Sequence, residues 1–406
     1  MHHLYRPTRR SLLAGLGAAA VAPRAMAQGQ AAGRSRILGG KHSTGWSDFR
    51  FHREGLIMML GSLKGRPARV LIDSGVSHVI VNHSFAQQAG LRRTGSARIS
   101  AVAGSTSGTA YVGVVVDVGG VRVTANQAIG ADLSQIGRVS GQEIDVIIGR
   151  DLFDFLIVDI DFPSRKIAFH NPRAYGPPPN AVPVPARALG NGLRYLPISV
   201  AGLAPVKATF DLGARAALLM SGVYATRHGL MKGRPVSTFV SVGVAGPSAS
   251  KIFTADGVNF AGLSLRGVPV VVPAAWGNDA RDIDSPIYVG LGLLSRFRII
   301  TDYPSERIWF VPSAQATSQP FRKDRSGTQL VLEANVLRVM HVSEGSPAAA
   351  AGWRVGDRIT AVNGRQVDAT YYDSELHAWQ YAAAGTAATL RLHDGSERRL
   401  ILQDYY

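Results

Sequence analysis

The chain has 406 residues, of which 46% are hydrophobic and 8% aromatic, so it can fill two or three packed domains and is not globally disordered. It contains no cysteine, which excludes disulfide bonds, catalysis by a thiol and a lipid anchor on cysteine. The net charge is +16, but the arginines are scattered rather than grouped with aromatic residues. We therefore expect no nucleic-acid partner.

Residues 1–27 are predicted to be an export signal. Arg9 and Arg10 precede a weakly hydrophobic run of Gly and Ala, and Ala25-Met26-Ala27 matches the small-x-small rule for signal cleavage. The paired arginines favour a twin-arginine signal over an ordinary Sec signal or an uncleaved anchor. No later stretch approaches 18 uninterrupted apolar residues. We expect a periplasmic or secreted protein whose mature chain has no transmembrane span.

The first half of the chain is predicted to be built from β-hairpins. Residues 28–45 are rich in Gly, Ala, Arg and Ser, which predicts a flexible lead-in. The β-branched and apolar runs that follow predict a hairpin whose second strand ends at Asp73. Residues 97–118 predict another hairpin, which could cover a cleft or simply be exposed. Its predicted tip is formed by small residues, Gly104, Ser105, Thr106, Ser107 and Gly108.

The second half repeats this pattern after a proline-rich segment. Residues 171–185 contain six prolines, which predicts a semi-rigid linker rather than a strand or helix. Asp211-Leu212-Gly213 then occupies the place that Asp73-Ser74-Gly75 has in the first half, and residues 239–252 predict a second covering hairpin around Gly243 and Gly246. The same landmarks in the same order indicate an internal duplication.

The two Asp-x-Gly turns resemble those of the aspartic peptidases of the retropepsin and pepsin type. The run Val146-Ile147-Ile148-Gly149-Arg150-Asp151-Leu152 also resembles the apolar strand behind the catalytic turn of retroviral proteases. This resemblance implies a mainly β fold with two tandem retropepsin-like β-barrel lobes in a pepsin-like pseudo-dimer. The lobes would span residues 46–172 and 188–312, joined by a linker at 173–187. Because both lobes lie in one chain, oligomerisation is not required.

By the same resemblance, Asp73 and Asp211 would form a catalytic pair that activates water, with Ser74, Gly75 and Gly213 supporting their turns. Two carboxylates that share one proton can supply both a base and an acid, so no cofactor and no metal is implied. The two hairpins would act as flaps over an extended peptide or an unfolded-protein substrate.

One position departs from the family pattern. The hydroxyl that follows the second catalytic aspartate is replaced by Leu212, which cannot hydrogen-bond across the pair of turns. The second turn is therefore expected to lose its brace. Two functions therefore stay open. The chain is an exported aspartic endopeptidase, as Asp73 and Asp211 favour, or it is a catalytically impaired protein that binds or scaffolds peptides, as Leu212 favours.

The C-terminal residues resemble bacterial PDZ domains. The resemblance rests on Gly345-Ser346-Pro347-Ala348, on Gly356-Asp357-Arg358-Ile359 and on Val362-Asn363-Gly364. A helix is predicted to begin with Ser346 as its cap and Pro347 as its first residue, and to run to Gly352. It implies an α+β module over residues 325–406 that recruits or regulates by binding a C-terminal peptide as an added strand. The peptide would lie beside a helix over residues 373–383. The implied peptide-binding loop consists of Gly327, Thr328, Gln329 and Leu330, with Arg325 nearby.

Overall fold

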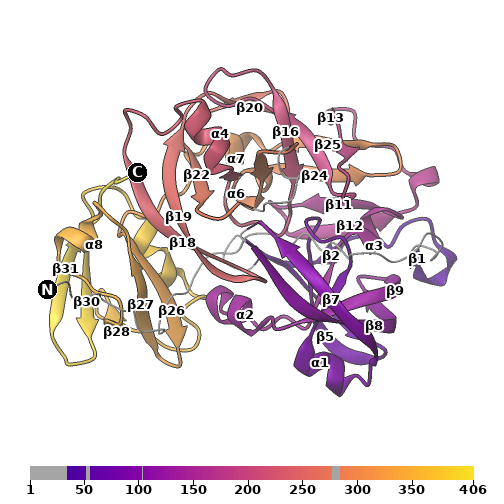
Figure 1. Ribbon diagram of the computed structural model, residues 1–406, viewed down its shortest axis with the longest axis horizontal. Coiled ribbons are helices and arrows are strands. Elements are labelled where there is room, and N and C mark those ends of the chain that lie inside the picture. The colour runs from indigo at the N-terminus through magenta and orange to yellow at the C-terminus, as the bar shows by residue number, and fades with distance from the viewer. Residues whose placement is uncertain (1–33, 52–54, 103, 277–283) are drawn as a thin grey trace, which may run out of the picture.

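The computed structural model describes residues 34–51, 55–102, 104–276 and 284–406. The predicted export signal lies outside these residues. The chain is mainly β, with 48% strand and 13% helix, which confirms the predicted fold class. Figure 1 shows two β-rich lobes beside each other and a smaller module at one end. None of the described helices is long and apolar enough to cross a membrane.

Lobe 1 is built on a nine-stranded sheet in the order β1-β9-β6-β10-β5-β4-β8-β7, with β3 paired to β4. Its strands are β1 (Arg34–Ile37), β3 (Arg50–Phe51), β4 (Ile57–Leu63), β5 (Arg66–Ile72), β6 (Val79–Asn82), β7 (Arg92–Ala101), β8 (Gly104–Val118), β9 (Val121–Ala131) and β10 (Val146–Ile148). Its short helices are η1 (Leu38–Gly40), α1 (His83–Gln88), α2 (Ser134–Ser140) and α3 (Arg150–Phe153).

Lobe 2 repeats this plan in an eight-stranded sheet, in the order β14-β15-β16-β23-β17-β22-β19-β18. Its strands are β14 (Arg187–Ala188), β15 (Arg194–Ile198), β16 (Val206–Phe210), β17 (Leu218–Met220), β18 (Val236–Gly243), β19 (Gly246–Ala255), β22 (Val268–Pro273) and β23 (Ile287–Val289). A separate pair, β20 (Val258–Phe260) and β21 (Leu263–Leu265), and the helices α4 (Gly222–Arg227) and α6 (Leu291–Leu294) complete it.

The duplication is visible in the strand that runs behind each Asp-x-Gly turn. In lobe 1, β10 lies between the strands before and after Asp73, parallel to β5 and antiparallel to β6. In lobe 2, β23 lies in the same way between β16 and β17. The register pairs Ile72 with Ile148 and Phe210 with Val289. Both carboxylates therefore leave their sheets at equivalent points.

A third, six-stranded sheet joins the lobes, in the order β13-β25-β24-β11-β12-β2. Lobe 1 supplies β2 (Ser47–Asp48), β11 (Ile157–Asp161) and β12 (Lys166–His170), and lobe 2 supplies β24 (Phe297–Asp302) and β25 (Arg307–Pro312). The closing hairpins of the two halves meet through β11 and β24, where Val158 pairs with Thr301. One buried apolar cluster extends through both lobes. The two Asp-x-Gly turns are thus held against each other by a common core.

Two segments that were predicted to lack regular structure form edge strands, so these predictions were wrong. The lead-in contains β1, which pairs with β9. The proline-rich linker contains η3 (Pro172–Ala174) and β13 (Val182–Pro185), and β13 pairs with β25. Pro183 and Pro185 have no N–H to donate, but β13 is the end strand of its sheet, where proline is tolerated.

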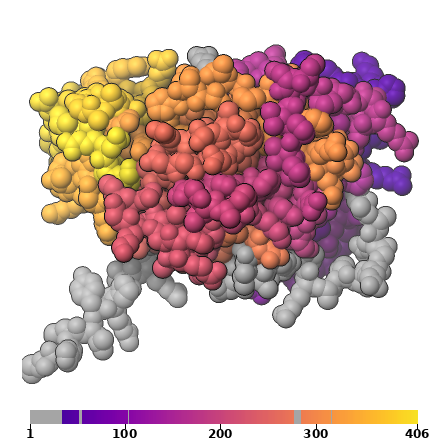
Figure 2. All heavy atoms as spheres, turned by 90° about the horizontal axis from the view of Figure 1, so that it is seen from above, coloured from indigo at the N-terminus to yellow at the C-terminus, as the bar shows by residue number. Residues whose placement is uncertain are grey.

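The C-terminal module has its own sheet, in the order β26-β27-β28-β30-β31 with β29 paired to β28, and its own apolar cluster. Its strands are β26 (Thr328–Glu333), β27 (Val336–Val342), β28 (Arg358–Val362), β29 (Arg365–Gln366), β30 (Ala387–Leu392) and β31 (Glu397–Ile401). Helix α7 (Ala314–Ser318) precedes the module. Figure 2 shows the module, in yellow, packed directly against the body of the protein.

The two predicted helices of this module have different outcomes. Helix α8 (Pro347–Ala350) begins as predicted, because Ser346 Oγ accepts a hydrogen bond from the Ala349 N–H at 3.2 Å and proline follows the cap. The helix predicted over residues 373–383 is a shorter 3₁₀ helix, η4 (Glu375–Tyr381). It begins late because Ser374 Oγ caps it by accepting from the Leu376 N–H.

Candidate active site

Asp73 and Asp211 occupy matching, buried turns. Asp73 is 4% exposed and Asp211 is 0% exposed. Backbone N–H groups hold each carboxylate within its own turn. The Gly75 N–H donates to Asp73 Oδ1 at 2.7 Å, and the Gly213 N–H donates to Asp211 Oδ1 at 2.9 Å. Asp211 Oδ1 also accepts from the Ala214 N–H at 3.1 Å. The aspartates are therefore oriented by backbone rather than by flexible side chains.

The two carboxyl groups lie close together, which is possible because the residue at position 213 is glycine. They lie within hydrogen-bonding reach of each other. A Cβ atom at Gly213 would come within 2.2 Å of Asp73 Oδ2, so any larger residue there would push this carboxylate away. Among the described protein groups, the buried Asp211 Oδ2 has no hydrogen-bond donor. A proton shared between the two carboxyl groups would satisfy it.

Burial and mutual repulsion keep a proton on this pair. Burial raises the pKa of Asp73 to about 6. Burial, together with the neighbouring charge of Asp73, raises the pKa of Asp211 well above its usual range. Two buried carboxylates in contact cannot both ionise at low cost, so the pair titrates as one unit. Near neutral pH the pair therefore holds one proton.

The raised pKa values predict that the pair destabilises the fold as pH rises. Below about pH 4 the two carboxyl groups are protonated in both the folded and the unfolded chain, so their titration does not lower the free energy of unfolding. As pH rises through about 6, the unfolded chain has already lost protons that the folded chain retains, so stability falls. We expect Asp73→Asn to be more stable than the parent by roughly 2–3 kcal/mol at pH 8 and by much less at pH 4.

Urea unfolding of both proteins at several pH values measures this difference. Subtracting one stability curve from the other cancels unrelated titrations such as that of Asp151, whose pKa burial also raises to about 6. A stability difference that stays constant from pH 4 to pH 8 would show that Asp73 is not protonated by burial.

Ser74 braces the turns from one side only. Its Oγ donates to the Phe210 carbonyl at 3.2 Å and accepts from the Leu212 N–H at 2.9 Å. The expectation that the second turn loses its brace was therefore wrong, because Ser74 reaches across from lobe 1 and holds that turn. What Leu212 removes is the reciprocal bond to the first turn. The Leu212 side chain is fully buried and packs in the common apolar core.

Ser74→Ala is expected to lower the free energy of unfolding by about 1–3 kcal/mol, because it leaves a buried N–H and a buried carbonyl without their partner. Denaturant unfolding measures the loss. Ser84→Ala is a suitable control, since Ser84 is exposed and its hydroxyl makes one long, 3.4 Å bond. Ser74→Thr keeps the hydroxyl and should stay close to the parent. Equal stability of the Ser74→Ala and Ser84→Ala variants would rule out the brace.

Two hairpins meet next to the Asp-x-Gly turns, where Ala101 packs in one buried cluster with Val76 and Val102 packs in another with Ala214. Hairpin β7–β8 turns at Val102, since Ala101 pairs with Gly104. The predicted tip residues Gly104, Ser105, Thr106, Ser107 and Gly108 therefore belong to β8, and this prediction was wrong. Their pairing with β7 continues because hydroxyl residues such as Thr106 are compatible with a strand. Hairpin β18–β19 turns between Gly243 and Gly246, where its tip was predicted.

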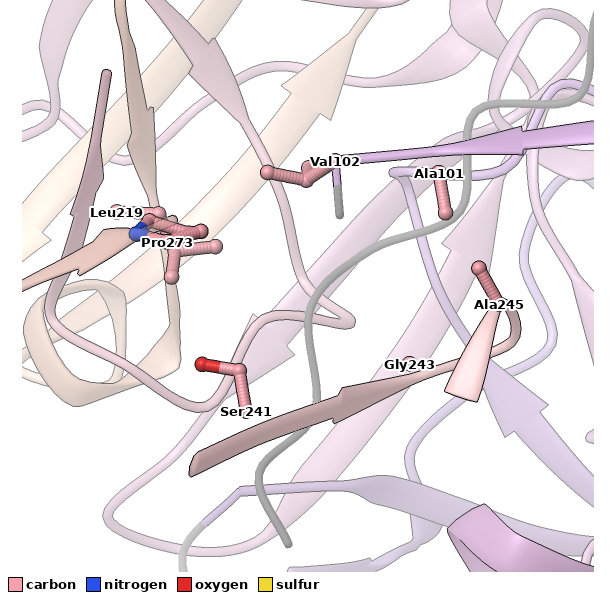
Figure 3. Close-up of a pocket in the computed structure, with 7 residues that line it drawn as sticks. All are labelled: Ala101, Val102, Leu219, Ser241, Gly243, Ala245 and Pro273. Atoms are coloured by element: carbon pink, nitrogen blue, oxygen red, sulfur yellow. The ribbon is translucent and has the colours of Figure 1, made fainter. Parts of the chain in front are cut away.

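The tips of these hairpins leave almost no free space between them. Figure 3 shows the Ala101 side chain pointing towards Ala245, whereas the Val102 side chain points towards Leu219 and Pro273. The cavity there measures about 10 Å³, too small for any side chain. Its lining residues are Ala101, Val102, Leu219, Ser241, Gly243, Ala245 and Pro273. Because Asp73 and Asp211 are buried, a peptide can reach the carboxylates only if the residues around them move apart.

A much larger cavity, of about 630 Å³, is lined by residues of both lobes and of the C-terminal module. Leu219 and Phe239 line it from lobe 2, and Gln329 and Gln380 line it from the module. Neither Asp73 nor Asp211 lines it, but Arg215, Ala216 and Ala217, which follow the second turn, do.

The structure places the predicted peptide-binding loop of the module mostly in a strand. Thr328, Gln329 and Leu330 begin β26, and only Gly327, with φ of 78°, forms a turn. The Gly327 N–H donates to Asp324 Oδ2 at 2.8 Å, and Arg325 pairs with Asp404 at 2.8 Å. The groups that were expected to receive a peptide carboxylate are therefore already bonded within the module.

The edge of β26 is also covered. Gln380 Nε2 donates to the Thr328 carbonyl at 2.6 Å, and the Tyr372 hydroxyl donates to the Leu330 carbonyl at 3.1 Å. β26 is the end strand of its sheet, so these carbonyls are the ones that an added peptide strand would use. Peptide binding in this mode requires Gln380 and Tyr372 to move.

Sequence reasoning assigned no role to Asp151, which supports the first turn. Asp151 Oδ2 accepts a hydrogen bond from the Val79 N–H at 2.9 Å, which ties helix α3 to the first residue of β6. The only signal was its position in the run that resembles retroviral proteases. Among the described residues, no cluster of His, Asp and Glu could hold a metal ion.

Comparison with known families agrees with this architecture. A family model described as aspartyl protease matches residues 59–152, which include Asp73 and hairpin β7–β8. A model of the PDZ domain matches residues 338–392. The chain thus carries an aspartyl protease domain followed by a C-terminal PDZ domain. No curated protein matches the chain.

Proposed function

We propose that this protein is an exported aspartic endopeptidase that hydrolyses extended peptide segments, with the PDZ domain recruiting substrate or regulating access. The observation that carries the proposal is the buried pair Asp73 and Asp211, which come from equivalent turns and lie within hydrogen-bonding reach. The aspartyl protease match around Asp73 supports it.

The proposed reaction needs only this pair and water. The ionised carboxylate takes a proton from a water molecule, whose oxygen attacks the peptide carbonyl carbon, while the protonated carboxyl donates to the carbonyl oxygen. The tetrahedral intermediate then breaks its C–N bond as the nitrogen receives a proton from one carboxyl group, while the other carboxylate takes a proton from a hydroxyl of the intermediate, so the pair again holds one proton. Asp73 and Asp211 titrate together, so neither is assigned a fixed role as acid or base.

The substrate is proposed to lie between the lobes, under hairpins β7–β8 and β18–β19. Glycine, alanine and valine dominate the two tips, where Val102 and Ala245 are neighbours of the small cavity. Such small side chains leave backbone groups accessible for pairing with an extended chain. An unfolded segment fits this arrangement better than a folded surface, because the hairpins must close over it.

The proposal is tested by measuring peptide-bond cleavage by the purified mature protein, whose first residue is Gln28. An unfolded protein mixture serves as substrate between pH 4 and pH 8, with new amino termini as the readout. We expect cleavage to rise from pH 4 towards pH 6, because one carboxylate of the pair must lose its proton to act as the base.

The competing function is a peptide-binding or scaffolding protein without activity. The buried Leu212, which removes one of the two hydroxyl braces, is the observation that favours it. Leu212→Thr restores the missing hydroxyl. No cleavage by either the parent or the Leu212→Thr variant at any pH would support the binding function and contradict the endopeptidase.

A further inference from the structure

The PDZ domain contacts one of the two hairpins that meet next to the Asp-x-Gly turns. β18 forms one arm of hairpin β18–β19 and is the end strand of the lobe 2 sheet. Figure 1 shows β18 running towards the strands β26 and β27 of the C-terminal module. An end strand has backbone N–H and C=O groups that its own sheet does not use. The outward-facing backbone groups of β18 therefore need hydrogen-bond partners from outside the lobe 2 sheet.

Gln329 of β26 supplies that partner. Its side-chain Oε1 accepts from the Val240 N–H at 2.8 Å, and its Nε2 donates to the Val240 carbonyl at 3.1 Å. A primary amide carries one acceptor and a donor side by side, so it pairs with one strand residue as a neighbouring strand would. Val240 is 3% exposed, so these backbone groups have little access to water.

Three further hydrogen bonds hold the same strand. Thr238 Oγ1 shares a hydrogen bond with His341 Nε2 at 3.1 Å and accepts from the Glu344 N–H at 3.0 Å. Ser237 Oγ donates to the Glu344 carbonyl at 2.5 Å. All the partners belong to β27 or to the turn that follows it. The polar contact thus extends from Ser237 to Val240 of β18.

An apolar contact lies next to this network. Val242 of β18, which is one residue before the end of the strand, packs in a small buried cluster with Val331 of β26 and Met340 of β27. Val139 of helix α2, in lobe 1, completes the cluster. The hairpin is therefore held between the PDZ domain and lobe 1, close to its turn at Gly243.

We propose that Gln329 is a positioning residue for hairpin β18–β19, so that the PDZ domain is part of the support of the peptidase cleft. The effect of Gln329 on catalysis rests on the proposed function, but its effect on the position of the hairpin does not. Gln329 lies on the same strand as Thr328 and Leu330, whose carbonyls Gln380 and Tyr372 cover. Its amide links that strand directly to the hairpin.

Hydrogen–deuterium exchange on the full chain tests the proposal without relying on activity. Gln329→Met keeps the length of the side chain but removes both hydrogen bonds to Val240. We expect amides at residues 241–249 to exchange about tenfold faster, while residues 358–392 in the module and hairpin β7–β8 keep the parent rate. Gln366→Met, at an exposed position in β29 of the same module, is the control and should change neither region.

A second variant approaches the contact from lobe 2. Thr238→Val removes the hydrogen bonds to His341 and Glu344 and should also accelerate exchange at residues 241–249. If the parent cleaves peptides, Gln329→Met should raise KM more than it lowers kcat, because the hairpin that covers the substrate is loosened. If the parent does not cleave peptides, the endopeptidase proposal fails. The exchange result alone then decides whether Gln329 positions hairpin β18–β19.

Unchanged exchange at residues 241–249 in both variants would overturn the proposal. Equal acceleration across the whole PDZ domain would also overturn it, because Gln329 would then be stabilising its own domain rather than positioning the hairpin.

Discussion

Replacing Asp73 or Asp211 by asparagine is expected to lower the rate of peptide cleavage by at least about 10³-fold. An amide cannot take a proton from water, and a single remaining carboxyl cannot act as base and acid in the same step. Because Gly75 and Gly213 donate to the oxygen that asparagine also carries, the turns should keep their geometry. The measurement is initial cleavage rate on one unfolded substrate at the pH of maximum activity.

The matched control is Asp48→Asn. Asp48 is exposed, and its ion pair with Lys166 at 2.7 Å lies on the surface, where such pairs contribute little. Its cleavage rate should equal that of the parent. A large loss in only one of the two site variants would contradict a shared mechanism, since both carboxyl groups are required at every turnover.

The second large effect is expected at the contact between the lobes. Asp159 of β11 is 1% exposed and accepts two hydrogen bonds from Arg298 of β24, at 2.9 Å from Nε and 2.7 Å from Nη2. Arg298→Met keeps the apolar stem but leaves the Asp159 charge buried without its cation. Removing one partner of a buried pair is strongly destabilising, and we expect a loss of about 3 kcal/mol in denaturant unfolding.

Arg122→Met provides the comparison for this experiment. Arg122 makes the same two-bond contact with Asp117, at 2.7 Å and 2.7 Å, but this pair is more exposed than the Asp159 pair. Its removal should leave stability nearly unchanged. If the two variants lost equal stability, burial of Asp159 would not be the cause, and the joining sheet would depend little on this ion pair.

The features that could be predicted from sequence are those with a local signal. Asp73 and Asp211 each follow an apolar strand, and a glycine stands two residues after each of them. The other motifs of the two halves also occur in the same order. The chemistry of a tight turn after a buried strand is fixed within a few residues. The turn between Gly243 and Gly246 was found for the same reason.

The features that were missed depend on partners distant in sequence. β1 and β13 were expected to lack regular structure because their composition is that of loops, yet each becomes a strand by pairing with β9 or β25. The bonds of Ser74 to lobe 2 and of Gln329 to Val240 are also non-local. Composition cannot reveal which strand edge a segment will meet. Export and the exact domain limits stay predictions.

The one-sided contact of Ser74 means that the two halves of the peptidase are no longer interchangeable. Two copies of lobe 1 would bring two serine hydroxyls to the axis, whereas two copies of lobe 2 would bring only Leu212 and no hydroxyl. Neither half can therefore substitute for the other in a homodimer with the same hydrogen bonds. Position 74 should accept only hydroxyl residues, while position 212 can vary among apolar ones, so mutational tolerance is divided unequally across a nearly symmetric site.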